Sequence, residues 1–316
     1  MWVLRFAMSE ARRRAVVTGA SGFIGSALTA HLSAEGWDVV TVDRRPFADG
    51  QPPSRLADVS QEGALAGLLD AGTVIFHLAA SADVAGSVAN PRHDFDNTFR
   101  GVFEVLEAAR HTGSRVVFPS TASIFDASNA LPLSERAFPR PTSPYAAGKL
   151  GGEAYCHAYH RSYGVDVRIA RLFSVYGIGM FRFAIHDIVR KIQQDHDDLV
   201  ILGDGTQVRD YLFIDDAVRG LTMVATEGAS GEEYNVASGA PVRLLELARL
   251  IAELMGYPNI RIRPSGRSFA GDTARWYADI SKVRALGFEP RVPLRDGLER
   301  TIAWLATRPV RAVVTS

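Results

Sequence analysis

The sequence predicts an α/β protein built on a doubly wound parallel sheet, with a smaller mixed α/β lobe in its C-terminal part. Three observations predict this fold. Short β-branched strands alternate with helical patterns, several strands are apolar without interruption, and a glycine-rich turn joins the first strand to the first helix. Alternating strands and helices favour a parallel sheet, and uninterrupted apolar strands are typical of a sheet covered on both faces.

Composition indicates the class of partner. The chain has 316 residues, of which 47% are hydrophobic, so it can bury a substantial core. Lys plus Arg and Asp plus Glu both total 35, so no net charge favours nucleic acid or an acidic membrane surface. We therefore expect a small-molecule partner, no nucleic acid, no membrane and no metal.

The first turn predicts a dinucleotide site. Residues 15–18 form a short apolar strand that leads into Gly19, Gly22 and Gly25, and apolar residues then recur at helical spacing. Glycines let the backbone approach a pyrophosphate, whose charge then lies at the positive end of the helix. A glycine motif alone is weak evidence, but this one stands between the strand and the helix that the mechanism requires.

The second strand, residues 38–43, ends in an acid. Asp43 can accept hydrogen bonds from both ribose hydroxyls and would repel a 2′-phosphate, which favours NAD over NADP. Arg44 and Arg45 follow directly and keep NADP open.

A third strand is expected at residues 56–59. Its Asp58 either reaches the adenine or caps a helix that begins near Gln61, and the two roles are compatible.

Small and hydroxylated residues gather where the next strands end. Residues 73–78 are predicted to form a buried strand, with His77 as a satisfied core residue, and the small residues that follow leave room for a cofactor. A helix is expected from Asp94 to Arg110, with Asn97 near its start as a bridge between backbone and catalytic groups. The strand at residues 115–118 delivers Ser120 and Thr121 to the same edge.

A helix over residues 144–163 presents a candidate catalytic pair. Ser143 suits the N-cap and Gly164 the C-cap. Tyr145 and Lys149 are four residues apart and share a helix face, so the ammonium can lower the pKa of the phenol and make it a usable general base. An isolated pair with this spacing is more often a coincidence on a helix surface, so the other motifs decide.

The C-terminal half is less regular. A sixth strand is expected at residues 165–172, helices near residues 185–194 and 241–255, and a mixture of strands and loops at residues 260–290.

The chain is accordingly divided as follows. We expect a lead-in over residues 1–13, an NAD-binding domain over 14–177 to which the chain returns around 211–240, and a substrate lobe over 178–316. The lone cysteine, Cys156, fits a reducing cytosol, and no apolar run approaches the roughly 20 residues of a membrane span. A cytoplasmic location is therefore expected.

Taken in order, these motifs resemble the extended short-chain dehydrogenase/reductase superfamily, in particular its nucleotide-sugar epimerases and dehydratases, and most of all the 4-epimerases of UDP-glucose and UDP-galactose. The likeness spans nearly all of residues 14–305 and includes the block from Gly203 to Asp216. It implies a Rossmann-type fold that binds NAD. The cofactor contacts that it implies are Gly19, Gly22, Phe23, Ile24, Gly25, Asp43, Asp58, Val59, Leu78, Ala79, Ala80, Asn97, Ser120, Tyr145 and Lys149.

The resemblance implies a catalytic trio of Thr121, Tyr145 and Lys149. Tyr145 would take the proton from a sugar hydroxyl while the neighbouring carbon gives hydride to NAD. Thr121 would hydrogen-bond that hydroxyl, and Lys149 would also bind the nicotinamide ribose. In an epimerase the resulting 4-keto sugar turns over and receives the hydride on its other face.

Two residues beside the trio favour epimerisation. The 4,6-dehydratases of the family carry an Asp-Glu pair after the Thr, whereas this chain has Ala122 and Ser123. Neither side chain can do carboxylate chemistry at neutral pH. Decarboxylases of UDP-glucuronate, which usually keep an acid in this loop, are disfavoured for the same reason.

The implied substrate is a nucleotide-diphosphate sugar. The substrate contacts that the resemblance implies are Ser81, Thr121, Ser174, Arg209, Asp272 and Trp276. Arg209 would bind the diphosphate, with an ion pair to Asp210 or Asp215 as the structural alternative. Trp276 would narrow the pocket and favour an unacetylated hexose.

The chain also departs from the family pattern. Ser174 stands in place of the usual Asn, Ile178 in place of Pro, and Phe269 in place of an Arg for which Arg267 could substitute. A nucleotide-sugar 4-ketoreductase, a decarboxylase and a non-catalytic nucleotide-binding relative therefore stay open. The family further implies a homodimer in which the helices at residues 94–110 and 144–163 pair across a two-fold axis.

Overall fold

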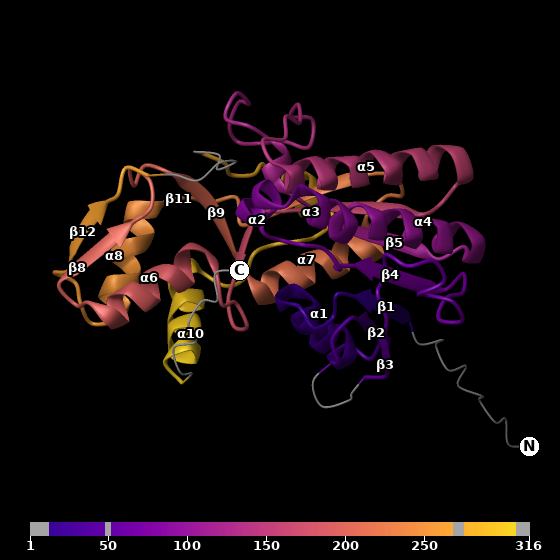
Figure 1. Ribbon diagram of the computed structural model, residues 1–316, viewed down its shortest axis with the longest axis horizontal. Coiled ribbons are helices and arrows are strands. Elements are labelled where there is room, and N and C mark those ends of the chain that lie inside the picture. Colours follow the sequence, from indigo (N-terminus) through magenta and orange to yellow (C-terminus); the bar gives the residue numbers. More distant parts are fainter. Residues whose placement is uncertain (1–12, 48–51, 268–274, 308–316) are drawn as a thin grey trace, which may run out of the picture.

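The computed structural model describes residues 13–47, 52–267 and 275–307, and its main feature is a seven-stranded parallel sheet (Figure 1). The strand order is β10-β6-β5-β4-β1-β2-β3. These strands are β1 (Arg14–Thr18), β2 (Asp38–Asp43), β3 (Ser54–Leu56), β4 (Thr73–His77), β5 (Arg115–Thr121), β6 (Val167–Leu172) and β10 (Glu233–Val236). The doubly wound parallel sheet predicted from the sequence is confirmed.

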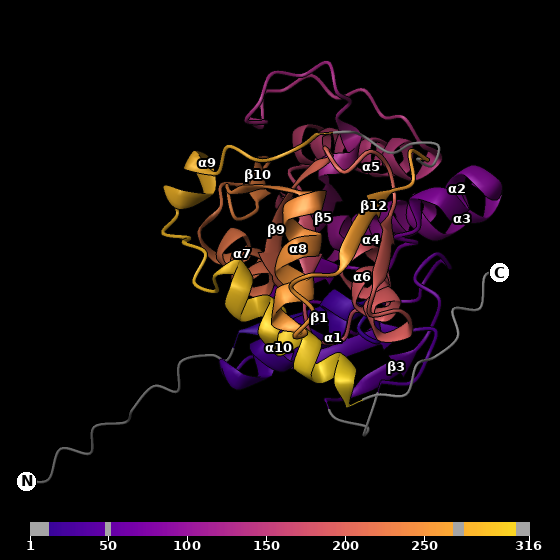
Figure 2. The ribbon, with the colours of Figure 1, turned by 90° about the vertical axis from the view of Figure 1, so that its left-hand side faces the viewer.

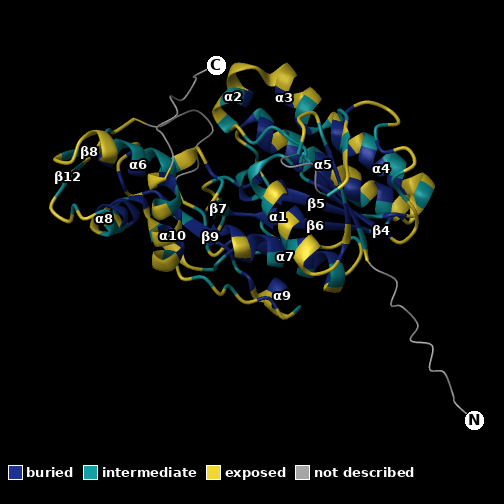
Figure 3. Ribbon diagram, turned by 90° about the horizontal axis from the view of Figure 1, so that it is seen from below, coloured by how far each residue is buried: buried dark blue, intermediate teal, exposed yellow. Residues whose placement is uncertain are grey.

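Helices cover both faces of this sheet (Figure 1). One face packs against α1 (Phe23–Ala34) and α7 (Ile214–Glu227), and the other against α4 (Arg100–Thr112) and α5 (Pro144–Tyr163). The central strand β4 is buried along its whole length, as its unbroken apolar sequence requires (Figure 3). Two hydrophobic cores result, one on each side of the sheet.

The smaller lobe follows β6 in the chain. It lies beyond one end of the sheet in Figure 1 and faces the viewer in Figure 2. It contains a three-stranded sheet in the order β11-β9-β7 and a parallel pair of β8 with β12. Its elements are β7 (Ser174–Tyr176), α6 (Phe183–Gln194), β8 (Asp198–Ile201), β9 (Val208–Phe213), β11 (Pro241–Arg243), α8 (Leu244–Leu254), β12 (Arg261–Pro264) and α10 (Leu294–Ala306). The short helix α9 (Ser281–Arg284) packs instead against β10 of the large sheet. Between β9 and β11 the chain returns to the large sheet through α7 and β10.

The helix predicted from Asp94 to Arg110 is two helices, α3 (Pro91–Thr98) and α4. Asn90 caps α3 by accepting from the amide of His93, so the helical region begins earlier than predicted. The break falls at Phe99, whose carbonyl accepts from Val102 at 3.1 Å, one residue closer than in a regular α-helix. A short helix, α2 (Val84–Ala89), precedes α3.

Other predicted boundaries also shift. The third strand is Ser54–Leu56 rather than residues 56–59, and residues 61–68 form turns instead of the helix expected after Asp58. Asp58 hydrogen-bonds Ser60 within its own turn, which satisfies the carboxylate locally. The sixth strand begins at Val167, and residues 241–243 pair with β9 as β11 before α8 begins.

Across the described ranges, we find no helix with the length and apolar character that a membrane crossing needs.

Candidate active site

The glycine turn between β1 and α1 makes a cradle with no room for side chains. Gly19 has φ +67°, and a Cβ on it would stand 2.6 Å from the amide nitrogen of Ala79. A Cβ on Gly25 would overlap the carbonyl oxygen of Gly19. The turn after β1 therefore lies close to the end of β4. Without side chains in this turn, a dinucleotide pyrophosphate could approach the backbone directly.

Asp43 lies beside this cradle. Its carboxylate accepts from the amide of Ser21 at 2.9 Å, which fastens the end of β2 to the glycine turn, and from the amide of Arg45 at 2.9 Å. The Arg45 guanidinium lies 3.9 Å from Asp43, and that of Arg44 lies 3.8 Å from Asp58. The two arginines that keep NADP open thus lie next to the two carboxylates.

Asp58 follows β3 at the same edge. Burial opposes ionisation of its carboxyl, but hydrogen bonds from Ser60 and the nearby charge of Arg44 hold the pKa of Asp58 below its usual value. The carboxylate is therefore charged at neutral pH and lies close to the end of β2.

The predicted helix with Tyr145 and Lys149 is present as α5. Ser143 accepts from the amide of Ala146 at 3.2 Å, and Gly164 ends the helix with φ +70°. Both predicted caps are confirmed. Tyr145 is 9% exposed and Lys149 is 5% exposed, so the pair lies inside the protein rather than on a helix surface.

Lys149 is directed at β5. Its Nζ donates to the carbonyl of Pro119 at 2.9 Å and lies 4.9 Å from the centre of the Phe118 ring. Burial lowers the pKa of Lys149 to about 8, while the charge of Asp94 opposes that shift.

Tyr145 departs from the sequence prediction in one respect. Burial raises the pKa of Tyr145 to about 12, whereas the sequence predicted that Lys149 would lower it. A hydrogen bond with Thr121 and the charge of Arg182 lower the pKa of the phenol, and Asp94 raises it further. The reason for the difference is that burial outweighs the favourable charges within the polypeptide.

The hydroxyls predicted at the end of β5 lie together. Thr121 Oγ1 donates to Ser123 Oγ at 3.2 Å and accepts from the Ser123 amide at 3.2 Å. Ser120 is 3% exposed, and its Oγ has no hydrogen-bond partner among the described residues. A buried hydroxyl without a partner beside a side-chain-free cradle fits a polar ligand such as NAD.

The end of β4 joins the cradle through its backbone. The amides of Leu78 and Ala79 donate to Thr18, the first to its carbonyl and the second to its hydroxyl, each at 3.2 Å. His77 is buried, and its Nδ1 lies 2.9 Å from the Thr18 hydroxyl, but its Nε2 has no partner within the described ranges. The prediction of a satisfied core histidine therefore holds for one ring nitrogen only.

Asn97 is turned into its own helix. Its Nδ2 donates to the carbonyl of His93 at 2.7 Å. The residues of this segment that lie against α5 are instead Asp94 and Thr98, both almost fully buried.

The predicted substrate residues Arg209 and Trp276 lie together. The Arg209 guanidinium is 4.1 Å from the centre of the Trp276 ring, and the Trp276 amide donates to the carbonyl of Val208 at 3.1 Å. Asp210 accepts from Ser238, Gly239 and Ala278, and Asp215 pairs with Arg300 at 2.7 Å. Both candidate ion-pair partners of Arg209 therefore bind other groups.

The remaining substrate predictions are only partly placed. Ser174 begins β7 and is paired with Tyr211 of β9, and Ser81 lies in the half-buried link between β4 and α2. Asp272 and Phe269 lie outside the described residues.

Sequence reasoning missed two charged residues near Tyr145. Asp94 lies in α3, and Arg182 is the N-cap of α6, followed by Phe183 with φ +68°. Both act on the charge of Tyr145. For Asp94 the sequence shows only an acid in a polar helical segment and not its burial. For Arg182 the sequence offers no signal, because its position depends on how the smaller lobe folds back.

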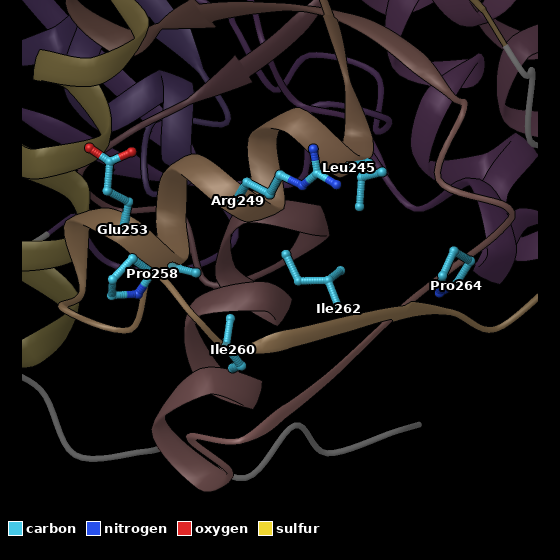
Figure 4. Close-up of a pocket in the computed structure, with 8 residues that line it drawn as sticks. Leu245, Arg249, Glu253, Pro258, Ile260, Ile262 and Pro264 are labelled. Carbon is cyan, nitrogen blue, oxygen red and sulfur yellow. The ribbon is translucent and has the colours of Figure 1, made fainter.

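One pocket lies away from all these residues. It is a hollow of about 320 Å³ between α8 and β12, lined by Leu245, Arg249, Ala252, Glu253, Pro258, Ile260, Ile262 and Pro264 (Figure 4). None of the predicted site residues lines it, so it is separate from the candidate active site.

Comparison with known proteins gives concordant results. The profile of the NAD dependent epimerase/dehydratase family matches residues 15–237. UDP-glucose 4-epimerase of Mycolicibacterium smegmatis is 32% identical over 93% of this chain and 99% of its own. dTDP-glucose 4,6-dehydratase of an Actinoplanes strain is 31% identical over 92% and 96%.

A solved structure is similarly close. UDP-glucuronic acid 4-epimerase of Bacillus cereus, a mutant form in complex with UDP-4-deoxy-4-fluoro-glucuronic acid and NAD, superimposes with a TM-score of 0.83. It is 29% identical, and the match covers 93% of this chain and 99% of that one. Because relatives of equal similarity differ in reaction, similarity assigns the family and its NAD cofactor but not the individual activity. This chain belongs to the NAD dependent epimerase/dehydratase family.

Proposed function

We propose that this protein is a nucleotide-sugar 4-epimerase that inverts C4 of a nucleotide-diphosphate hexose, with Tyr145 as its base. The observation that carries the proposal is that Tyr145 and Lys149 are buried together on α5, with Thr121 acting on the phenol and two residues after Thr121 that are not acids. NAD, when bound, accepts a hydride from the sugar and returns it. The remaining chemistry is proton transfer and positioning by this chain's own residues.

Tyr145 takes the proton of the C4 hydroxyl and gives it back after the sugar has turned over. Thr121 holds that hydroxyl, and its contact with Ser123 orients the Thr121 side chain. Lys149 is anchored on the Pro119 carbonyl. It would hold the nicotinamide ribose when NAD is bound, and its positive charge would favour the phenolate there.

The neighbours of Thr121 support epimerisation over loss of water. Ala122 is 1% exposed and apolar, and the Ser123 hydroxyl is engaged with Thr121. Elimination of water from C5 and C6 needs an acid and a base at the sugar, and neither residue titrates in the neutral range. A 4-keto sugar formed here therefore has no built-in route to a dehydrated product.

The test is to incubate the purified protein with UDP-, dTDP-, GDP- and CDP-hexoses and to follow C4 stereochemistry by NMR. We expect interconversion of the C4 epimers of one nucleotide sugar without added cofactor, and NAD released when the protein is denatured. A 4-keto-6-deoxy product, or turnover that consumes added NADPH, would reject the proposal.

Arg182 favours a second candidate, a nucleotide hexuronate as substrate of the same reaction. Its charge lowers the pKa of Tyr145, so the guanidinium lies within electrostatic range of the proposed base. A sugar carboxylate at C5 could form a charge-assisted pair with it, whereas a hydroxymethyl group could not. The Bacillus cereus relative, a UDP-glucuronic acid 4-epimerase, supports this candidate by analogy.

The two candidates are separated by kcat/KM. If the second holds, UDP-glucuronate is preferred over UDP-glucose, and Arg182→Gln lowers kcat/KM for the uronate by about tenfold or more with little effect on the hexose. A wild-type preference for UDP-glucose would reject the second candidate.

We also propose a homodimer formed through α4 and α5. Phe95, Phe103, Tyr155 and Tyr163 are 54%, 40%, 40% and 58% exposed, and the Phe99 ring packs 5.2 Å from Tyr155. A connected row of exposed aromatic rings suits a second copy of the same face. Light scattering should give a dimer for the wild type and a monomer for Tyr155→Asp, while Phe138→Asp, which changes an exposed ring elsewhere, stays dimeric. A monomeric wild type would contradict this.

A further inference from the structure

Asp94 is a buried carboxylate at the contact between α3 and α5. It is 2% exposed, and its Oδ1 accepts from Thr98 Oγ1 at 3.3 Å. Its Oδ2 lies 3.9 Å from the position that a Cβ on Gly148 would occupy, and Thr98 Cγ2 lies 3.4 Å from that position. Because Gly148 has no side chain, α3 can bring a carboxylate against the turn of α5 that carries Tyr145 and Lys149.

Lys149 is a buried ammonium that needs nearby negative charge. Its direct partner is a neutral carbonyl, that of Pro119. Glu153, one turn further along α5, is already bound by Arg171 through two hydrogen bonds of 3.0 and 2.7 Å. The Asp94 carboxylate, by contrast, is held only by the long bond from Thr98 among the described residues, so its charge is available to Lys149.

We propose that Asp94 is a positioning residue of the catalytic pair, whose negative charge keeps Lys149 protonated and restrains the ionisation of Tyr145. The inference rests on the proposed function in taking Tyr145 and Lys149 as that pair. Asp94 itself touches neither the reacting hydroxyl nor the hydride acceptor, and it acts through the charges of the two residues on α5.

The charged groups around the three residues support this assignment. Burial lowers the pKa of Lys149, and three neighbouring groups oppose that effect, namely Asp94, Cys156 and Glu153. His77, on β4, lies close enough to Lys149 for the two to interact.

Charged groups also surround Asp94 and Tyr145. Asp94 is faced by Lys149, His93 and Asp83, and burial raises its pKa. Tyr145 is faced by Thr121 from β5 and by Arg182 from the start of α6, both of which lower its pKa, whereas Asp94 raises it.

The expected effect of removing the charge has a defined sign. In Asp94→Asn the phenol of Tyr145 loses a neighbouring negative charge, so it ionises at lower pH and the rise of kcat with pH moves down. Lys149 loses the same negative charge, so its ammonium also deprotonates at lower pH. The pH at which kcat rises should therefore fall by about half a unit or more, a result that a merely structural role would not give.

The decisive measurement needs no substrate. The lysines of this chain are Lys149, Lys191 and Lys282, so the Cε signals of lysine-labelled, NAD-bound protein are few and Lys149→Arg identifies the one of interest. We expect buried Lys149 to titrate below an ordinary lysine in the wild type, and at least about half a unit lower still in Asp94→Asn. Asp96→Asn, an exposed carboxylate on the same helix, is the matched control and should leave the signal unchanged.

The outcomes are distinguishable. A folded Asp94→Asn protein whose Lys149 signal and kcat profile match the wild type would overturn the inference. If Asp94→Asn does not fold, Asp94→Ser is the second neutral variant, and Asp94→Glu should restore the wild-type titration. A Lys149 signal that moves while no nucleotide sugar is epimerised would uphold the charge coupling and reject the proposed function.

Discussion

The edge of the large sheet and the smaller lobe build their parts of the site differently. At the edge of the large sheet, backbone groups at the strand ends form the predicted cofactor site. Gly19 lies against the backbone of Ala79, and the Ser21 amide donates to the Asp43 carboxylate. In the smaller lobe, the predicted substrate residues meet through their side chains, with the Arg209 guanidinium stacked on the Trp276 ring. For the proposed function, this difference means that NAD binding rests on the fold itself, whereas we expect the choice of substrate to rest on a few exchangeable side chains.

The largest expected effect tests the chemistry at the edge. Tyr145→Phe removes the proton acceptor but little of the surface around the glycine turn, so kcat should fall by about 10³-fold while NAD stays bound. Epimerisation rates and the nucleotide released on denaturation measure the two quantities. Turnover like that of the wild type would refute the mechanism.

A second substitution tests the backbone cradle. In Gly19→Ala the new Cβ would meet the Ala79 amide, so NAD affinity should fall by about tenfold or more. Gly36→Ala is the control, since Gly36 also has positive φ but no atom lies within 4 Å of its Cβ position. Equal losses in the two variants, measured by NAD titration, would show that backbone strain and not the close approach is responsible.

A third substitution addresses the smaller lobe. Arg209→Lys keeps the charge but loses the planar stack on Trp276, so KM for the nucleotide sugar should rise by about fivefold with kcat almost unchanged. Steady-state kinetics check the split. If kcat falls by a larger factor than KM rises, Arg209 contributes to the chemical step, and the smaller lobe does not serve substrate binding alone.

A fourth substitution concerns the pH dependence of stability rather than activity, at the buried end of β4. Burial lowers the pKa of His77 to about 3, against 6.5 for a free side chain. Between these values the unfolded chain binds more protons than the folded one, so the free energy of unfolding falls as pH falls, by up to about 1.4 kcal/mol per unit. His77→Gln should flatten this dependence in urea denaturation measured across the window, and an unchanged slope would contradict it.

Local signals predicted the parts of the fold that depend on neighbours in the chain. Ser143 and Gly164 gave both ends of α5 because caps are local hydrogen-bond choices. The third strand was placed two residues late because Asp58 and Ser60 satisfy each other in a turn, an outcome that competes with strand and helix alike.

The parts of the site that depend on distant contacts were not predictable in the same way. The stack of Arg209 on Trp276 and the approach of Asp94 to α5 join residues far apart in sequence. The pKa of Tyr145 was predicted with the wrong sign, because helix spacing shows a neighbouring Lys149 but not the burial that raises the pKa of the phenol.

The position of β10 has a consequence for how the chain can be made and cut. The last strand of the large sheet, Glu233–Val236, is synthesised only after β7, α6, β8 and β9 of the smaller lobe, and it pairs with β6. In a chain that ends before β10, strand β6 has no partner on one side and becomes an edge strand. Every residue of β6 is buried in the complete fold, so this exposed edge would invite association with other chains. We therefore expect truncation at the end of β7 to give an association-prone cofactor half, because the sheet is complete only once residue 236 has been synthesised.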